Sequence, residues 1–230
     1  MLTLEAQTTS QLAVILAKHK GDVLYRGQTA DYGSKTESGM RTSFTRHGCS
    51  PPAMVKWSHY AEFMLRQLLP DPDVIKCLEL PQAVLQHYGW RSFFLDASTS
   101  PAVSAWFAGY SWSGNPTLEG VEDCFENFVI LRRQQAHYEA ANGNGFLYVV
   151  SVPELRRAGI PIHDLSVLQL GAARPQVQKA QLVGPLHSDL PRSCIAVRIA
   201  APTAVMRAFA AREGYRGLTN CFHPQIVIRS

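Results

Sequence analysis

The chain has 230 residues, 46% hydrophobic and 17% charged, which supplies a sizeable core and excludes global disorder. Its longest uninterrupted apolar run, residues 12–17, is well short of the roughly 18 residues of a membrane span. Five cysteines at wide spacing, without a Cys-x-x-Cys pair, predict neither a disulfide framework nor a zinc site. The N-terminus lacks the basic start of a signal peptide, so we expect a cytoplasmic protein without a metal or a membrane segment.

The net charge of +4 is distributed unevenly along the chain. From Arg174 onward, eight Lys/Arg face two acidic residues, so this part carries +6 and the remainder carries −2. A basic C-terminal part suits a partner that bears phosphate. Nucleic-acid binding is therefore one alternative function, although no Lys/Arg-rich run is present.

In chain order, periodicity and turn residues predict helices at 9–19, 54–68, 81–88, 101–108 and 203–213. The same signals predict strands at 23–25, 92–95, 128–131, 145–152, 193–199 and 226–228. Loops are expected over 29–50 and 111–127, and residues 174–181 are compatible with an edge strand. With helices concentrated in the N-terminal half and strands after it, we predict an α+β fold in a single domain, residues 1–230.

The first segment with chemical potential is Tyr25-Arg26-Gly27-Gln28 at the end of a predicted strand. A guanidinium group forms paired hydrogen bonds with phosphate or ribose oxygens. The adjacent glycine would let the backbone approach a ligand closely. A surface arginine before a turn glycine would look the same, so this segment alone decides nothing.

Two further segments carry suitable side chains. His87 and Tyr88 stand at the predicted end of a helix, and a histidine-tyrosine pair can hold a sugar or stack on a flat ring. Asp96 and the hydroxyl run Ser98-Thr99-Ser100 precede the helix predicted from Pro101. Free N–H groups at a helix start are receptive to an anion, and ordinary helix capping is the alternative explanation.

In combination and order, these segments resemble the FRG family, named for its Phe/Tyr-Arg-Gly motif. The resemblance runs from Tyr25-Arg26-Gly27-Gln28 through the stretches 85–89 and 94–108 to Arg174 and Gln178, and then to Gly214 and 222–224. It covers residues 10–226, and residues 86–108 are its most specific part.

The FRG family is similar in layout to the ADP-ribosyltransferase superfamily, which implies a split β-sheet core and NAD as the substrate. By that resemblance, Arg26 would hold the pyrophosphate or the adenosine ribose, and Ser98 would support the nicotinamide ribose. His87 and Tyr88 would lie near the nicotinamide or ribose. The implied catalytic residues are Arg26, His87, Ser98 and Gln178, and the implied NAD-binding residues are Tyr25, Arg26, Gly27, Gln28, His87, Tyr88, Asp96, Ser98, Thr99 and Ser100.

The sequence departs from this pattern at two positions. Phe93 replaces an arginine of the FRG pattern, and Gln178 stands where the transferases have a glutamate. A neutral glutamine keeps a hydrogen bond to ribose but not the negative charge that stabilises an oxocarbenium-like transition state. Losing that charge costs on the order of 3 kcal/mol, roughly a hundredfold in rate. Glu37 or Asp96 are candidates to supply the charge instead.

The resemblance predicts an enzyme that cleaves the nicotinamide–ribose bond of NAD and transfers ADP-ribose to a protein or nucleic acid, in the manner of a bacterial toxin or phage-defence effector. An NAD hydrolase and a catalytically weak nucleotide-binding module are the alternatives, because a fold alone does not establish activity.

Overall fold

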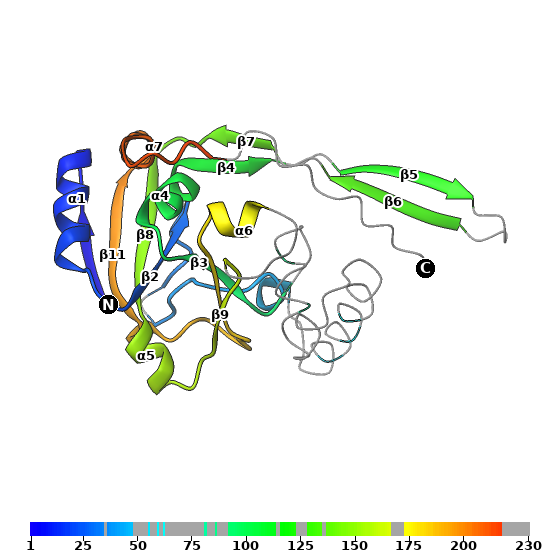
Figure 1. Cartoon of the computed structure of the whole chain (residues 1–230), viewed down its shortest axis with the longest axis horizontal. Helices are drawn as coiled ribbons and strands as arrows, with labels where there is room; N and C mark the ends of the chain where they lie inside the picture. The colour runs from blue at the N-terminus through cyan, green and yellow to red at the C-terminus, as the bar shows by residue number, and fades with distance from the viewer. Residues whose placement is uncertain are drawn as a thin grey trace.

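A computed structural model describes residues 1–34, 36–47, 92–113, 116–122, 128–134, 137–166 and 173–217, with the single positions 55, 59, 62, 81 and 86. Its centre is a seven-stranded sheet in the order β1-β11-β8-β2-β3-β10-β9 (Figure 1). The strands are β1 Leu2–Glu5, β2 Val23–Gln28, β3 Leu95–Ser98, β8 Asn144–Ser151, β9 Ile162–Asp164, β10 Ala180–Val183 and β11 Ile195–Pro202. Only the β1–β11 pair is parallel, and the architecture is α+β as predicted.

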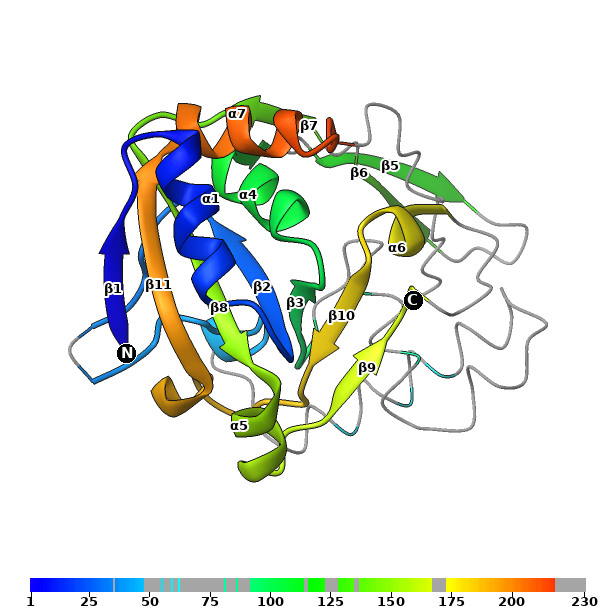
Figure 2. The same ribbon diagram turned by 60° about the vertical axis from the view of Figure 1, so that its left-hand side comes forward.

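The sheet is nearly divided between β2 and β3. β2 pairs with β8 over six residues, and β3 pairs with β10 over four. β2 and β3 share a single pair, Tyr25 with Ser98. Figure 2 shows β2 and β10 diverging on the two sides of β3. The sheet therefore consists of two parts, β1-β11-β8-β2 and β3-β10-β9, which meet at one residue pair.

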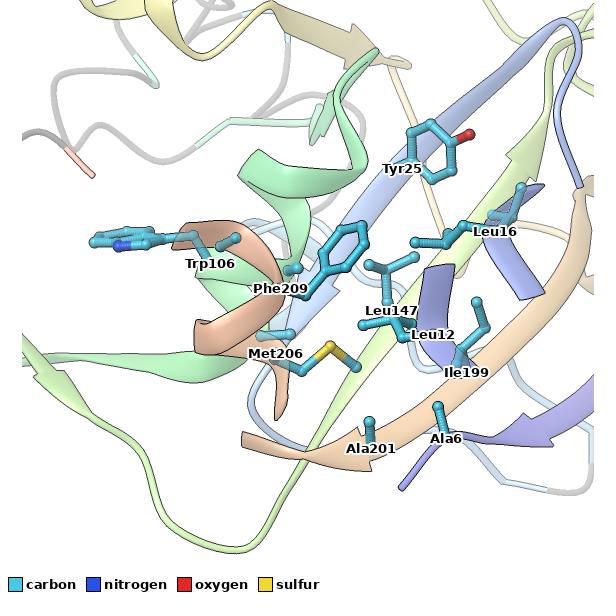
Figure 3. Close-up of a cluster of buried hydrophobic side chains, with 14 of the residues drawn as sticks. Ala6, Leu12, Leu16, Tyr25, Trp106, Leu147, Ile199, Ala201, Met206 and Phe209 are labelled. Carbon is cyan, nitrogen blue, oxygen red and sulfur yellow. The ribbon is translucent and has the colours of Figure 1, made fainter. Parts of the chain in front are cut away.

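Three helices cover one face of the larger part: α1 Thr9–Lys18, α4 Pro101–Gly109 and α7 Thr203–Arg212. Their apolar sides meet the sheet in a cluster that Figure 3 shows around Leu147, with Leu12, Leu16 and Phe209 packed against it. Leu12 and Leu147 are completely buried. Burying a leucine side chain contributes about 1.5–3 kcal/mol, so this cluster is a main source of stability.

Two glycines let α4 lie directly on the sheet. A Cβ atom at Gly27 on β2 would lie 1.7 Å from the carbonyl oxygen of Ser104, and one at Gly145 on β8 would lie 2.2 Å from that of Ala108. Both atoms belong to the α4 backbone and cannot move aside without moving the helix. The glycine that we expected to admit a ligand therefore admits a helix.

The opposite face of the sheet has its own core, formed with α5 (Val152–Arg157) and the segment around Met40. Met40 is completely buried, and its carbonyl oxygen accepts a hydrogen bond from the Leu190 amide at 3.0 Å. Asp189 accepts from Gly39 N at 2.9 Å and from Arg41 Nε at 2.6 Å. The described part of the predicted 29–50 loop is thus fixed against the sheet.

Two antiparallel ribbons extend from this body in Figure 1. β4 (Tyr110–Ser113) pairs with β7 (His137–Ala140), and β5 (Pro116–Glu122) pairs with β6 (Phe128–Gln134). The prediction of a loop over 111–127 was wrong for the residues in β4 and β5, because each finds a partner strand later in the chain. Pairing between separated segments leaves little local signal in the Gly- and Asn-containing sequence.

Several predicted elements are confirmed, with shifted ends. α1, β2, α4, β6, β8, β11 and α7 lie where the sequence predicts them. Thr8 caps α1, since its hydroxyl accepts from Gln11 N at 3.2 Å. Among the described helices, α5, α6 (Ala173–Val177) and α7 lie in the second half of the chain, so helices are not confined to the first half.

Two other predicted elements need correction, and several more fall on residues that the structure does not describe. The strand predicted over 92–95 lies at Leu95–Ser98 instead, because Ser92 turns the chain by exchanging hydrogen bonds with Ser43. The predicted edge strand over 174–181 is the short α6 followed by β10, which lies between β3 and β9. Most of the helices predicted over 54–68 and 81–88, and the strand over 226–228, lie outside the described residues.

Candidate functional site

Arg26 is a half-buried cation at the junction of the two sheet parts. It stands on β2 opposite Tyr148 of β8, and its Nη1 donates to the Asp96 carbonyl oxygen of β3 at 2.5 Å. Its Nε is buried and has no hydrogen-bond partner among the described residues. Burial lowers the pKa of the guanidinium, Asp96 opposes this shift, and nearby Arg46 adds to it. A buried Nε–H without an acceptor is costly, so an anion that reached it would be favoured.

Ser98 has a hydroxyl group that is already used within the protein. It donates to the Gln178 carbonyl oxygen at 2.7 Å and accepts from Ser100 N at 3.0 Å. Only 3% of Ser98 is exposed. The hydroxyl that the resemblance assigns to ribose therefore ties the end of β3 to the turn before β10.

Gln178 lies in that turn and is buried, with 7% exposed. Its neighbour Lys179 has a φ of 45°, and the Lys179 carbonyl oxygen accepts from Thr99 N at 3.3 Å. No hydrogen bond joins the Gln178 side-chain amide to any residue in the described part of the chain. The structure thus brings Arg26, Ser98 and Gln178 onto or beside three adjacent strands, β2, β3 and β10.

The two acidic residues expected to replace a glutamate differ in surroundings. Glu37 accepts from Arg41 Nη2 at 2.6 Å in an exposed ion pair, on the segment fixed by Asp189. Asp96 is exposed on β3, the strand whose backbone receives Arg26. Of these two carboxylates, only Asp96 belongs to the residue set around Arg26.

His87 and Tyr88 lie outside the described residues, but the preceding residue is placed. The Ser92 hydroxyl donates to the Gln86 side-chain oxygen. Beyond Ser92, Phe93 is buried and stacks on Phe44, with ring centroids 4.2 Å apart. The phenylalanine that replaces the arginine of the FRG pattern is therefore a core residue in this chain.

In the comparison with protein families, residues 21–114 match the family model described as the FRG domain. These 94 of the 230 residues are similar to an FRG domain. No curated protein and no solved structure matched the chain. The matched segment begins just before β2 and ends just after β4, so it contains β2, β3 and α4.

The residues of the motif Tyr25-Arg26-Gly27 face opposite sides of the sheet. Tyr25 and Gly27 face the core under α1 and α4, and Arg26 points to the other face.

The sequence analysis did not predict a network of polar side chains around Asp31, which lies beside Arg26. Asp31 accepts from the Tyr148 hydroxyl at 3.0 Å and from Arg198 Nη1, and its Oδ1 also accepts from Gly33 N at 3.0 Å. Burial raises the pKa of Tyr148, and the Asp31 carboxylate raises it further. These residues stand on β8, β11 and the segment after β2, and only the tertiary fold makes them neighbours.

A cleft of about 690 Å³ opens where the two parts of the sheet separate. The FRG residues Tyr25 and Thr99 line it, whereas Arg26, Ser98 and Gln178 do not. Its other lining residues come from the α1–β2 connection, α5, β9, β10 and the residues before β9. The FRG residues therefore form two groups: Tyr25 and Thr99 line the open cleft, and the half-buried Arg26 lies outside it.

The described residues contain no group of three or more His, Cys, Asp or Glu side chains arranged to hold a metal ion. Within the same part of the chain, no helix has both the length and the apolar character needed to cross a membrane.

Proposed function

We propose that this protein binds NAD through Arg26 and is an ADP-ribosyltransferase-like enzyme. In the proposed reaction the bond between nicotinamide nitrogen and ribose C1′ breaks, and nicotinamide leaves with the electron pair. An acceptor oxygen or nitrogen on a protein or nucleic acid then bonds to C1′ and loses its proton. Such chemistry would suit a toxin or phage-defence effector.

The observation that carries this proposal is the state of Arg26. Its side chain is half-buried, its buried Nε is unpaired among the described residues, and Arg46 is a nearby like charge. A pyrophosphate would supply the missing acceptor and the missing negative charge at once. Gln28 Oε1, two residues along β2, is also buried without a partner in the described part and suits a ribose hydroxyl donor.

The proposed site lacks a strong group to stabilise positive charge on the ribose in the transition state. Gln178 is neutral, and the Ser98 hydroxyl is bonded internally. The enzyme would therefore act chiefly by holding the substrate in place, which lowers the entropic part of the barrier. We expect a slow turnover in the absence of the physiological acceptor.

The test begins with binding. NAD is titrated calorimetrically into the full chain, into Arg26→Ala and into Arg26→Lys. Removing a charge-assisted hydrogen bond costs about 1.5–3 kcal/mol, so Arg26→Ala should bind NAD roughly 10- to 100-fold more weakly. Arg26→Lys keeps the charge but loses the paired donors, and an intermediate affinity is expected. Arg212→Ala, an exposed arginine on α7, is the matched control. Equal NAD affinity in Arg26→Ala and the control would remove Arg26 from the site.

Turnover is then measured as nicotinamide release from NAD, with and without cell lysate, followed by mass spectrometry of the products. Release with an ADP-ribose adduct identifies a transferase and its acceptor. Release without an adduct identifies an NAD hydrolase.

A catalytically weak nucleotide-binding module is the second candidate, and the buried neutral Gln178 favours it. Folded protein that binds NAD and releases no nicotinamide under either condition would establish this alternative.

A further inference from the structure

The cleft beside the sheet junction has the size and the wall of a small-molecule site. Its volume of about 690 Å³ lies within the range of about 300–1,000 Å³ that is common for ligand pockets. Arg26 is not among its lining residues. A ligand here would contact a different set of side chains from the proposed NAD phosphates.

Two inward side chains present unused polar groups to this cleft. Tyr25 is 7% exposed and Gln181 is 5% exposed, and both line the cleft. Neither the Tyr25 hydroxyl nor the Gln181 amide has a hydrogen bond to any residue that the structure describes. In Figure 3 the Tyr25 ring lies against the helical core, with its hydroxyl turned away from Phe209. Neither polar group is among the fully buried unpaired atoms, so both reach solvent at the cleft and are available to a ligand with donors and acceptors.

The remaining wall is aliphatic and electrically balanced. Val23, Leu24, Val152, Ile160 and Ile162 supply apolar surface. Lys20 and Arg156 on the lining are balanced by Asp22 and Asp164, and Arg156 Nη1 lies 3.0 Å from Asp22 Oδ2. A formally neutral lining disfavours a polyanion, and the mixture of apolar and polar surface suits a ligand that has both a ring and several polar groups.

We propose that this cleft is a second ligand site, which binds an uncharged nucleoside. The base would lie on the aliphatic wall, where burial of its ring removes apolar surface from water. The hydroxyl of Tyr25 and the amide of Gln181 would pair with polar atoms of the base or the ribose, because each can both donate and accept. Thr99, exposed at the same wall, adds a further hydroxyl.

This inference is independent of NAD cleavage, because it concerns binding at residues other than Arg26. Adenosine, guanosine, cytidine and uridine are each titrated calorimetrically into the full chain, with free ribose and glucose as ring-free comparisons. The variants are Tyr25→Phe, which retains the ring, and Gln181→Met, which retains the side-chain length. Gln176→Met is the matched control, since Gln176 is exposed on α6.

We expect at least one nucleoside to bind, with about tenfold weaker binding in Tyr25→Phe and in Gln181→Met, the effect of losing one hydrogen bond. The Gln176→Met control should bind that nucleoside as the wild type does. Circular dichroism and thermal melting show that each variant is folded before titration.

Three outcomes would overturn the proposal: no nucleoside binds the folded wild type at millimolar concentration, affinity is unchanged in both cleft variants, or ribose and glucose bind as tightly as nucleosides. Loss of nucleoside binding in Arg26→Ala, with both cleft variants unaffected, would instead place the nucleoside at the proposed NAD site. Failure of NAD turnover alone would leave the cleft proposal standing.

Discussion

Arg26 and Ser98 both belong to the predicted site, but their polar groups differ in whether they are already bonded within the protein. Arg26 is a half-buried cation whose buried Nε has no acceptor among the described residues, and an anion would supply one. Ser98 is fully engaged, because its hydroxyl joins the Gln178 carbonyl and the Ser100 amide. We therefore infer that Arg26 contributes to binding and that Ser98 contributes chiefly to the shape of the junction.

Gln178→Glu tests whether this position corresponds to the transferase glutamate. If NAD ribose lies beside residue 178, a carboxylate there should raise the rate of nicotinamide release, by up to about a hundredfold. Initial rates at saturating NAD measure the effect, and Gln178→Met serves as the uncharged control. A Gln178→Glu protein that is folded, binds NAD and is no faster than wild type would show that residue 178 does not face the reacting carbon.

Cys194 is completely buried, and burial raises the pKa of its thiol. The unfolded chain releases this proton at its ordinary pKa of about 8.5, while the folded chain keeps it. The folded state thus binds more protons above that pH, and the free energy of unfolding falls as pH rises, by at most about 1.4 kcal/mol per pH unit. The measurement is urea unfolding at pH 7 to 9.5 in wild type and Cys194→Ala, whose difference should shrink with rising pH. A constant difference would contradict the shift.

At the scale of elements, the contact of α4 with β2 and β8 determines how the helix after β3 lies on the larger part of the sheet. That contact depends on Gly27 and Gly145, which have no side chain to separate the backbones. α4 follows directly from the Ser98-Thr99-Ser100 segment, with Ser100 at its N-cap position. The packing of α4 therefore fixes the end of β3 as well.

Gly27→Ala should destabilise the protein strongly. The new methyl group would overlap the Ser104 carbonyl oxygen, and overpacking of this kind costs about 1–3 kcal/mol or more. Gly159→Ala is the control, because Gly159 has open space around its Cβ position and a φ of 68°. It should lose only about 1–2 kcal/mol, from backbone strain. Chemical denaturation of both variants compares the two effects, and an equal loss would mean that α4 can move away from β2.

At the scale of the whole molecule, the FRG match covers only part of a continuous sheet. Residues 21–114 contain β2 and β3, whose principal partners are β8 and β10. Those partners, and β11 beyond β8, come from residues after 140. The arginine of the motif and the cleft next to it are therefore completed by segments outside the matched region.

A fragment of residues 21–114 should consequently fail to fold. It would expose the edges of β2 and β3 and lose most of the cluster around Leu147. Circular dichroism and amide proton dispersion should show an unfolded chain, whereas residues 1–230 give a cooperative thermal transition. A folded 21–114 fragment would contradict the dependence of the motif on the rest of the sheet.

The sequence by itself determined the α+β class, the FRG segment and the helices α1, α4 and α7. These follow from local patterns: apolar spacing along a helix, a proline at its start and a glycine at its end. The order Tyr25-Arg26-Gly27-Gln28, followed by the stretch from Phe94 to Trp106, indicated the resemblance to the FRG family, whose model matches residues 21–114.

Only the tertiary structure decided what these residues do. The role of Gly27 depends on α4, about 80 residues later in the chain, and the surroundings of Arg26 depend on Asp96, Tyr148 and Arg46. The cleft lies where β2 and β3 meet at one residue pair and then separate, and both Tyr25 and Gln181 line it. Pairing between distant strands is set by the total free energy of the packed sheet, which no local pattern of residues encodes.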